Sequence, residues 1–288
     1  MRAYRDKQDG RARWPRLVQL VLSDLLPNLL PSACPLCGNL PRRSRGVRNA
    51  GAGLSGALSG RRLGMNSLLC AACDAAYWNE ARLRCAVCAL PLASARGTRG
   101  GHGAGRYPCD ACVKAPPAFD ATIALADYRA PLDALARGLK YRARLGLGEE
   151  FAMRLAHAAD DLLDPADAPT LIVPVPLSRE RLVERGYNQA WQIAKPLARA
   201  LGTRADATLV RRTLHTAAQA RLDRDTRRRN VGRAFALKDG GPTLRGLHIG
   251  VVDDVMTSGA TLDALAQKLK AAGARRVTNF VALRTPKD

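Results

Sequence analysis

The stretch HIGVVDDVMTSGAT, residues 248–261, decides how this sequence is interpreted. A short apolar run, typical of a buried strand, ends in two adjacent carboxylates, Asp253 and Asp254. A turn of small and hydroxyl residues follows, and a helical pattern begins directly after it. The start of a helix offers unpaired backbone N–H groups and a positive dipole end, both of which favour a phosphate. The predicted phosphate loop consists of Thr257, Ser258, Gly259, Ala260 and Thr261.

The two acids indicate what lies beside this phosphate. A carboxylate repels phosphate, but it accepts hydrogen bonds from sugar hydroxyls. A phosphate site next to a diol site is the pattern expected for a phosphorylated ribose. The alternative is that the acids cap the helix, for which one acid suffices. Two other phosphate folds are disfavoured, because the sequence has no G-x-x-x-x-G-K-[ST] and no G-x-G-x-x-G after a strand.

Strand and helix patterns alternate over residues 118–288. Apolar runs predict strands at 121–128, 170–176, 247–254 and 275–283. Amphipathic segments predict helices at 131–141, 148–163, 188–202 and 260–274. This alternation predicts an α/β fold with a mostly parallel sheet flanked by helices. In such folds ligands bind at the carboxyl ends of strands, where Asp253 and Asp254 lie.

Eight cysteines form four C-x-x-C pairs, and none follows residue 112. Two thiolates at this spacing bind one metal ion, and two such knuckles complete a tetrahedral zinc site with four thiolate ligands. We therefore expect two structural zinc ions rather than disulfides or redox-active pairs. Either neighbouring knuckles share a zinc, or knuckles alternate between the two sites. The expected ligands are Cys34, Cys37, Cys70, Cys73, Cys85, Cys88, Cys109 and Cys112.

Composition divides the chain into a disordered N-terminus at 1–13, an N-terminal helix with a double zinc ribbon at 14–117, and the α/β domain at 118–288. The start of the chain resembles a lipoprotein signal peptide, but Asp24 and Pro27 interrupt its apolar run. Its apolar residues instead fit one face of a short helix: Leu17, Leu20, Val21, Leu25 and Leu29. No membrane span is expected, and reduced thiols predict a cytoplasmic location.

The formal charge of +21 predicts anionic partners such as nucleic acid, a phosphorylated substrate or an anionic membrane surface. The alternative is a coding bias toward arginine, with solvated side chains. Arginines are densest between Arg211 and Arg233, where Asp223 and Asp225 are the only acids. A guanidinium group can donate two parallel hydrogen bonds to the oxygens of one phosphate, so this segment suits phosphate binding. The alternative is a solvated helix face, which would have the same composition.

Together these features resemble a known family. The stretch VVDDVMTSGAT at 251–261 resembles the phosphoribosyl pyrophosphate (PRPP) motif of type I phosphoribosyltransferases. With the cysteine pairs, the chain is similar to the ComF family, whose members join an N-terminal double zinc ribbon to such a domain. The insertion at 42–64 departs from the family pattern within the first ribbon. Further matching stretches are LKYRARLGLG at 139–148, VPVPLSRERLVERGYNQA at 173–190 and RRTLHTAAQARLDRDTRRRNVGRAF at 211–235.

The resemblance implies roles for individual residues. Asp253 and Asp254 would bind the ribose 2′- and 3′-hydroxyls, and residues 257–261 would wrap the 5′-phosphate. Mg²⁺ would bridge oxygens of the pyrophosphate and the ribose, with few protein ligands. The loop expected to face the pyrophosphate contains Leu177, Ser178 and Arg179. A mobile loop closes over the leaving pyrophosphate in this superfamily, which makes Arg221, Arg228 and Arg229 the catalytic candidates.

Five further residues have two interpretations each. Arg185, Asn188 and Gln189 either face the site or are structural, and Asn188 suits a helix cap. Lys140 and Tyr141 either reach the site or end a helix.

The resemblance implies a glycosyltransferase of the phosphoribosyltransferase type, which uses PRPP and an acceptor that the sequence does not identify. It also implies a link to DNA uptake in natural transformation, with single-stranded DNA or a DNA-processing helicase as partner. The competing hypothesis is a non-catalytic zinc-ribbon protein that binds single-stranded DNA in the cytoplasm. Such binding usually uses stacked aromatic side chains, and the chain has few; Trp14, Tyr77, Trp78 and Tyr107 lie in or before the ribbon module.

Overall fold

The structure is a computed structural model. It describes residues 33–40, 67–78, 83–92, 107–213, 234–238, 241 and 243–286. The chain divides into two compact units, Met1–Cys70 and Ala71–Asp288, each of which is described by itself. The predicted N-terminal helix and the insertion at 42–64 lie outside the described residues. The predicted boundaries near residues 13 and 117 stay predictions.

In the first unit, Cys34 and Cys37 lie on a tight turn. The N–H of Gly38 donates to the Cys34 carbonyl at 2.9 Å, and the N–H of Cys34 donates to the Asn39 carbonyl at 2.7 Å. Cys34 is buried, whereas Cys37 is exposed. This is the compact knuckle that the C-x-x-C spacing predicts.

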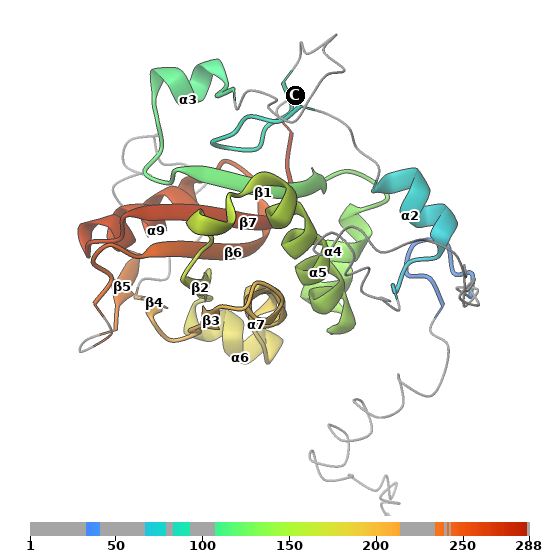
Figure 1. The fold of residues 1–288 in the computed structure, drawn as a ribbon. Helices are drawn as coiled ribbons and strands as arrows, with labels where there is room; N and C mark the ends of the chain where they lie inside the picture. Colours follow the sequence, from blue (N-terminus) through green and yellow to red (C-terminus); the bar gives the residue numbers. More distant parts are fainter. Residues whose placement is uncertain are drawn as a thin grey trace, which may run out of the picture. The chain divides into compact units, whose positions relative to one another are not determined.

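The second unit is built on a five-stranded sheet in which every pair of neighbouring strands is parallel (Figure 1). The central strands β6 and β7 are almost continuously buried, as expected for strands covered on both faces. In spatial order the strands are β1 (Ala121–Asp127), β7 (Arg276–Arg284), β6 (His248–Met256), β2 (Leu171–Pro174) and β3 (Arg204–Ala205).

Helices cover both faces of this sheet. Helix α9 (Ala260–Ala271) packs on one face, where its leucines share a hydrophobic cluster with Ile249 and Val251 of β6. Helices α5 (Gly146–Leu162) and α7 (Gln189–Ala200) pack on each other and against β1, β2 and β6. Helix α4 (Asp133–Tyr141) lies beside α5, and α6 (Arg179–Arg185) follows β2 (Figure 1). The predicted fold class, a mostly parallel sheet flanked by helices, is confirmed.

Close packing of α5 on α7 depends on a glycine. A Cβ atom on Gly148 would lie 2.7 Å from the carbonyl oxygen of Gln192, which is closer than real Cβ contacts. A larger residue would push α7 away from the sheet. Because α7 begins at Gln189, this contact helps to fix the start of α7 at the sheet edge.

The third and fourth cysteine knuckles belong to the core of the second unit. Cys85, Cys88 and Leu90 share the hydrophobic cluster that contains the α9 leucines. Arg84, next to the knuckle, forms an ion pair with Asp127 at the end of β1, with an N–O distance of 2.9 Å. Two short helices accompany the cysteines, α2 (Ala71–Tyr77) and α3 (Asp110–Lys114).

The predicted strands and helices of the α/β part all occur, with differences at their ends. Strand β6 runs to Met256, two residues past the predicted end, because Asp253 and Val255 still pair with β7. Several short elements were not predicted, since runs of two to seven residues are too short to show a clear period. These are α6, β3 and the antiparallel pair β4 (Val210–Arg212) and β5 (Phe235–Leu237).

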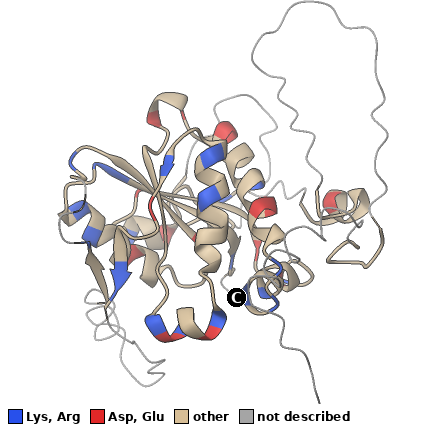
Figure 2. Cartoon of the chain, turned by 90° about the horizontal axis from the view of Figure 1, so that it is seen from below, with Lys and Arg blue, Asp and Glu red and all other residues tan. Residues whose placement is uncertain are grey.

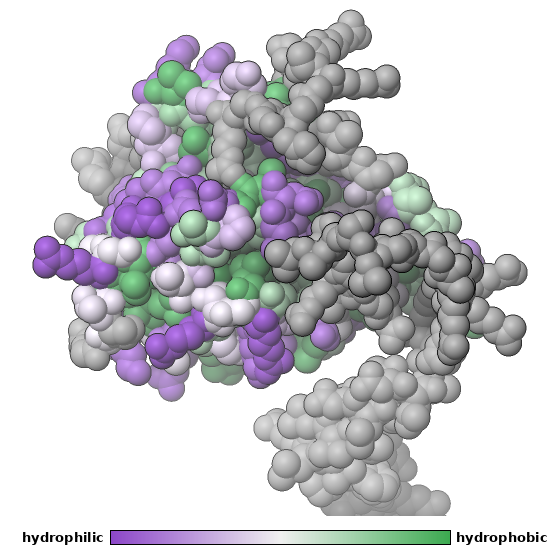
Figure 3. Space-filling view, viewed as in Figure 1, coloured by the Kyte–Doolittle hydropathy of each residue, from purple (hydrophilic) through white to green (hydrophobic). Residues whose placement is uncertain are grey.

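Within the described stretches, no helix has both the length and the hydropathy needed to cross a membrane. Polar and apolar side chains mix on the face seen in Figure 3.

Candidate functional site

The carboxyl ends of β2 and β6 lie side by side and bring two of the predicted loops together. Pro174 pairs with Val252, and the N–H of Val175 donates to the Val252 carbonyl at 2.9 Å. The chain after β2 leads to Ser178, and the chain after β6 leads to Thr257. This is the strand-end position where ligands bind in parallel α/β folds.

The two acids of the motif are adjacent near the end of β6, and their carboxyl groups interact with each other. Asp254 is only 2% exposed, and its Oδ1 accepts from Nε2 of Gln189 on α7 at 3.4 Å. Its Oδ2 has no hydrogen-bond partner among the described residues. Asp253 is half-buried and interacts with the charges of Asp254 and Lys140. The two predicted diol ligands therefore have different surroundings.

Burial and the neighbouring charge of Asp254 raise the pKa of Asp253 well above its usual range. The carboxyl accepts the N–H of Asp254 at 2.9 Å, and the charge of Lys140 acts in the opposite direction. An acid perturbed in this way is a candidate for binding a cation or a hydroxyl donor.

The turn after β6 has the geometry of an anion cradle. The backbone N–H groups of Thr257, Ser258 and Gly259 donate to no described residue. The Ser258 hydroxyl accepts the N–H of Ala260 at 3.3 Å, and α9 starts there. Thr257 and Ser258 are exposed, while Ala260 and Thr261 are half-buried in the first turn of α9. The predicted phosphate loop is thus an open turn whose donors have no acceptor in the described part of the chain.

Gly259 is required in this turn. Its φ of +83° lies in the left-handed region, and an added Cβ would meet Cε of Met256 at 2.6 Å. The methyl of Met256 can move aside, so it is the positive φ that excludes larger residues without strain. Glycine therefore lets the chain turn sharply from β6 into α9.

The residues predicted to face the pyrophosphate begin α6. Ser178 is buried and caps this helix, its Oγ accepting the N–H of Arg181 at 3.4 Å. Arg179 is exposed at the first helical position, and Leu177 is half-buried. The serine hydroxyl is thus occupied as a cap, whereas the guanidinium of Arg179 is accessible.

The stretch RGYNQ at 185–189 links three elements to the site. Asn188 caps α7 through Oδ1, which accepts the N–H of Ala190 at 2.9 Å, and its Nδ2 donates to the Val175 carbonyl at 3.0 Å. Tyr187 donates its hydroxyl to the Leu139 carbonyl on α4. Arg185 donates to Oε1 of Gln189, whose Nε2 reaches Asp254. Asn188 is therefore both a cap and a tether of the loop after β2.

The catalytic candidates Arg221, Arg228 and Arg229 lie outside the described residues. They belong to the stretch between β4 and β5, which pair antiparallel at its base. One arginine of this segment that was not singled out, Arg212, ends β4. Burial lowers its pKa, while the carboxylate of Asp253 acts in the opposite direction, so the two charges interact. No sequence signal distinguishes Arg212 from its many arginine neighbours.

The cysteines form two sets in which neighbouring knuckles combine. The sets are Cys34, Cys37, Cys70 and Cys73, and Cys85, Cys88, Cys109 and Cys112. Within each set, the sulfur atoms lie within 4.8 Å of one another. Tetrahedral zinc with Zn–S bonds of about 2.3 Å needs sulfur atoms about 3.8 Å apart. The Sγ–Sγ distances of 3.7 Å for Cys88 and Cys109, and 3.5 Å for Cys37 and Cys70, fit such a site.

Backbone donors favour the thiolate of Cys85 in the second set. Burial alone would raise the pKa of Cys85, but the N–H groups of Cys88 and Cys109 lower it to about 7. These donors lie 3.4 and 3.1 Å from the Cys85 sulfur. Burial dominates at Cys88 in the same knuckle and raises its pKa to about 11. Because the thiolate is the form that binds metal, Cys85 is the thiol of this knuckle that is most readily available to a zinc ion.

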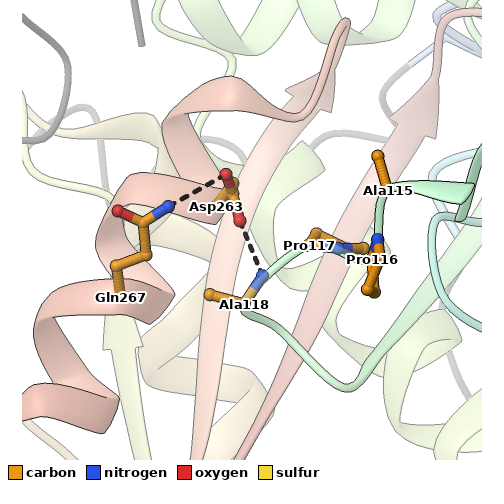
Figure 4. Close-up of a pocket in the computed structure, with 6 residues that line it drawn as sticks. All are labelled: Ala115, Pro116, Pro117, Ala118, Asp263 and Gln267. Atoms are coloured by element: carbon orange, nitrogen blue, oxygen red, sulfur yellow. Dashed lines mark hydrogen bonds between the residues drawn. The ribbon is translucent and has the colours of Figure 1, made fainter. Parts of the chain in front are cut away.

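A separate pocket of about 400 Å³ lies beside α9 (Figure 4). The Asp263 carboxylate in it accepts the N–H of Ala118 at 2.7 Å and Nε2 of Gln267 at 3.2 Å. This acid therefore holds the segment before β1, at Ala118, onto α9. The pocket is lined by Ala115, Pro116, Pro117, Ala118, Asp263 and Gln267, none of which was a predicted site residue.

Lys and Arg are spread over several helices and strands of the described part and are interspersed with Asp and Glu (Figure 2).

Curated proteins similar to this chain cover most of its length. DNA utilization protein YhgH of Escherichia coli is 32% identical over 221 residues, which cover 75% of this chain and 90% of that protein. YhgH of Salmonella typhi is 33% identical over 223 residues, with the same coverages. Competence protein F of Haemophilus influenzae is 30% identical over 171 residues, covering 59% of this chain and 75% of that protein. No family model matches the chain.

Solved structures give weaker likenesses. A purine phosphoribosyltransferase from Pyrococcus horikoshii is 16% identical, covers 50% of this chain and 86% of that chain, and has a TM-score of 0.31. An adenine phosphoribosyltransferase from Thermoanaerobacter pseudethanolicus is 16% identical, covers 50% and 83%, and has a TM-score of 0.32. TM-scores this low do not bear on the function of this chain.

Proposed function

Since this chain belongs to the family of DNA utilization protein YhgH and competence protein F, the ComF family, we propose that it is a phosphoribosyltransferase that binds PRPP with Mg²⁺ and acts in DNA utilization in the cytoplasm. The observation that carries this proposal is the open turn after β6. Three backbone donors there have no protein acceptor among the described residues, and a half-buried carboxylate precedes them on the same strand.

Each part of the site has a role in this proposal. The N–H groups of residues 257–259 and the α9 N-terminus hold the 5′-phosphate. Asp253 accepts from a ribose hydroxyl, and Asp254 joins it when the ligand displaces the long 3.4 Å contact with Gln189. Arg179, exposed after β2, faces the pyrophosphate. Mg²⁺, when bound, neutralises charge on the pyrophosphate.

The reaction is a displacement at the anomeric carbon of the ribose. The bond from this carbon to pyrophosphate breaks as the bond to the acceptor forms, and negative charge grows on the leaving pyrophosphate. Guanidinium groups stabilise that charge most effectively where water is excluded. Arg221, Arg228 and Arg229 remain the proposed donors, and Arg212 at the base of the segment joins them because its charge interacts with that of Asp253.

Isothermal titration of the zinc-loaded protein with PRPP and Mg²⁺ tests the proposal. We expect saturable binding by the wild type and loss of binding in the Asp253→Asn/Asp254→Asn double variant. Asp160→Asn, which changes an exposed acid on α5, is the matched control and keeps wild-type affinity. An absence of binding by the wild type, or unchanged binding by the double variant, would refute the proposal.

A second candidate function, binding of single-stranded DNA, is favoured by one surface feature. Tyr141 is 70% exposed, and its ring lies 5.6 Å from the guanidinium carbon of Arg185 and 5.7 Å from Nζ of Lys140. An exposed ring beside two cations suits a base stacked next to its phosphate. Arg185 and Gln189 connect this feature to Asp254, so DNA bound here would lie near the proposed ribose site.

Fluorescence anisotropy with a labelled single-stranded oligonucleotide tests this candidate. Affinity should fall steeply with salt and weaken about tenfold or more in Tyr141→Ala, because stacking on one base contributes roughly 1–3 kcal/mol. Val183→Ala, at an exposed apolar side chain on α6 that cannot stack on a base, serves as the comparison. Binding that is insensitive to salt, or equal losses in both variants, would argue against it.

A further inference from the structure

Arg284 is a buried cation that none of the roles above explains. It is the last residue of β7 and is only 3% exposed. Burial of a charged group is costly unless each of its polar atoms finds a partner. The acceptors around Arg284 therefore indicate what the residue is for.

The acceptors of Arg284 come from two different parts of the second unit. Its Nε donates to the carbonyl of Cys88, in the third knuckle, at 2.8 Å. Its Nη1 lies 2.9 Å from the Met256 carbonyl and 2.8 Å from the Thr285 carbonyl, and it also contacts the Thr257 carbonyl. One side chain thus joins the second cysteine set to the turn that begins the phosphate loop.

These contacts determine which way the loop donors point. In a planar trans peptide the C=O and the N–H point in opposite directions. Because the carbonyls of Met256 and Thr257 turn toward Arg284, the N–H groups of Thr257 and Ser258 turn away from it. Those are two of the three loop donors that have no acceptor among the described residues. The Met256 carbonyl also accepts the N–H of Thr285 at 2.9 Å, so Arg284 acts chiefly on the Thr257 carbonyl and thereby on the peptide plane that aims the Ser258 N–H outward.

We propose that Arg284 is a positioning residue that couples metal binding at the second cysteine set to the geometry of the phosphate loop. Cys88 is both a member of that set and the acceptor of Arg284 Nε, so fixing its thiolate also fixes its carbonyl. A loosened knuckle would release Arg284, and the loop donors would lose their orientation. Any effect of this coupling on PRPP binding rests on the proposed function. The coupling between the cysteine set and the loop geometry does not depend on it.

Lysine is the informative substitution. A guanidinium is planar and donates in two directions, toward Cys88 with Nε and toward the loop with Nη1. An ammonium is a single point donor on a flexible stem and cannot span both acceptors. Arg284→Lys keeps the charge but breaks the link. Arg276→Lys is the matched control, because Arg276 begins the same strand and pairs with Asp167 at its opposite end.

Hydrogen exchange of full-length, zinc-loaded protein, followed by mass spectrometry, tests the coupling without any ligand. We expect the amides of Ala260 and Asp263, which donate to the loop at Ser258 Oγ and the Gly259 carbonyl, to exchange about tenfold or more faster in Arg284→Lys, relative to peptides of β6 and β7 as internal reference. Cys112→Ser, which removes one ligand of the second set, should have the same effect. The two changes combined should add little, since both break one link. Arg276→Lys should exchange as the wild type does.

The proposal is overturned if the loop exchanges at the wild-type rate in Arg284→Lys, or if Arg276→Lys speeds it equally. If Arg284→Lys does not fold, Cys112→Ser decides alone, and an unchanged loop in that variant refutes the coupling. PRPP titration is a separate measurement, in which we expect affinity to fall about tenfold in Arg284→Lys with both zinc ions retained. A wild type that binds no PRPP would refute the proposed function, while the exchange data would still decide the coupling.

Discussion

At the scale of single residues, the two acids of the opening motif are not equivalent. Asp253 is half-buried. The charge of Lys140 lowers the pKa of Asp253, and the charge of Asp253 in turn raises the pKa of Arg212. Asp254 is buried against Gln189 with one oxygen unpaired among the described residues. Two ligand hydroxyls would donate hydrogen bonds to these carboxylates and so stabilise their charged forms. This gives the acids a physical reason to bind a diol.

Asp253→Asn is expected to stabilise the free protein at neutral pH and to weaken PRPP binding. The pKa of Asp253 is raised above its ordinary value of 3.8 by burial and by Asp254. Protonation of Asp253 therefore adds to the free energy of unfolding. This contribution is complete below the unfolded pKa of about 3.8 and is lost as the pH rises through the raised pKa of the folded state. At about pH 7.5 a carboxyl at this position lowers the free energy of unfolding, because either its charge or the proton it binds on folding costs free energy, and asparagine removes that cost.

Urea unfolding at several pH values, with PRPP titration in parallel, checks this prediction. At about pH 7.5, Asp253→Asn should unfold at a higher urea concentration than the wild type, and this difference should shrink toward pH 4. The PRPP affinity of the variant should be about tenfold or more lower. Asp160→Asn should change neither quantity. A variant that is less stable than the wild type at about pH 7.5 would contradict the sign of the effect.

At the scale of elements, the start of α7 organises the site. Asn188 joins the helix to the loop after β2, and Gln189 joins it to Asp254 on β6. The close contact at Gly148 sets the distance between α5 and α7. The stretch RGYNQ thus connects α4, the loop after β2 and the end of β6.

Two substitutions of Asn188 separate its roles. Asn188→Ala removes the cap and the bond to Val175, and should lower the free energy of unfolding by about 1–2 kcal/mol. Asn188→Ser keeps a capping oxygen but loses the donor to Val175, so its stability should be nearer to that of the wild type. PRPP affinity should fall in both variants. Wild-type affinity in Asn188→Ser would mean that the Val175 bond does not position the loop.

At the scale of the whole molecule, the two cysteine sets differ in their surroundings. Cys85 and Cys88 lie in the hydrophobic cluster of the second unit, whereas Cys37 is exposed in the first. Metal binding at the second set should therefore contribute directly to the stability of the sheet. This agrees with the general observation that small zinc sites built from four cysteines fold with their metal.

Metal analysis of protein purified without chelator should give close to two zinc ions per chain, one for each set. Cys88→Ser should lose one zinc and lower the thermal midpoint of the second unit by several degrees. Cys37→Ser should also lose one zinc, but with a smaller effect on that transition. Equal shifts in the two variants, or a metal-free protein of full stability, would contradict this expectation.

Much of the fold could be predicted because its signals are local. Apolar runs marked β1, β2, β6 and β7, and amphipathic periods marked α4, α5, α7 and α9. The eight thiols and the turn at 257–261 could also be found by spacing alone, since a knuckle or a helix start is built from residues three or four apart. The sequence by itself determined the fold class and which thiols and loop residues belong to the candidate sites.

Only the tertiary structure decided how that inventory is assembled. It combined neighbouring knuckles, turned Asp254 toward Gln189, and joined Cys88 to the phosphate loop through Arg284. Cys88 and Arg284 lie 196 residues apart in the chain, and Gln189 and Asp254 lie 65 apart. The physical reason is that such contacts depend on strand register and on which face a side chain occupies. Pairing between distant strands sets both, and no local pattern records them.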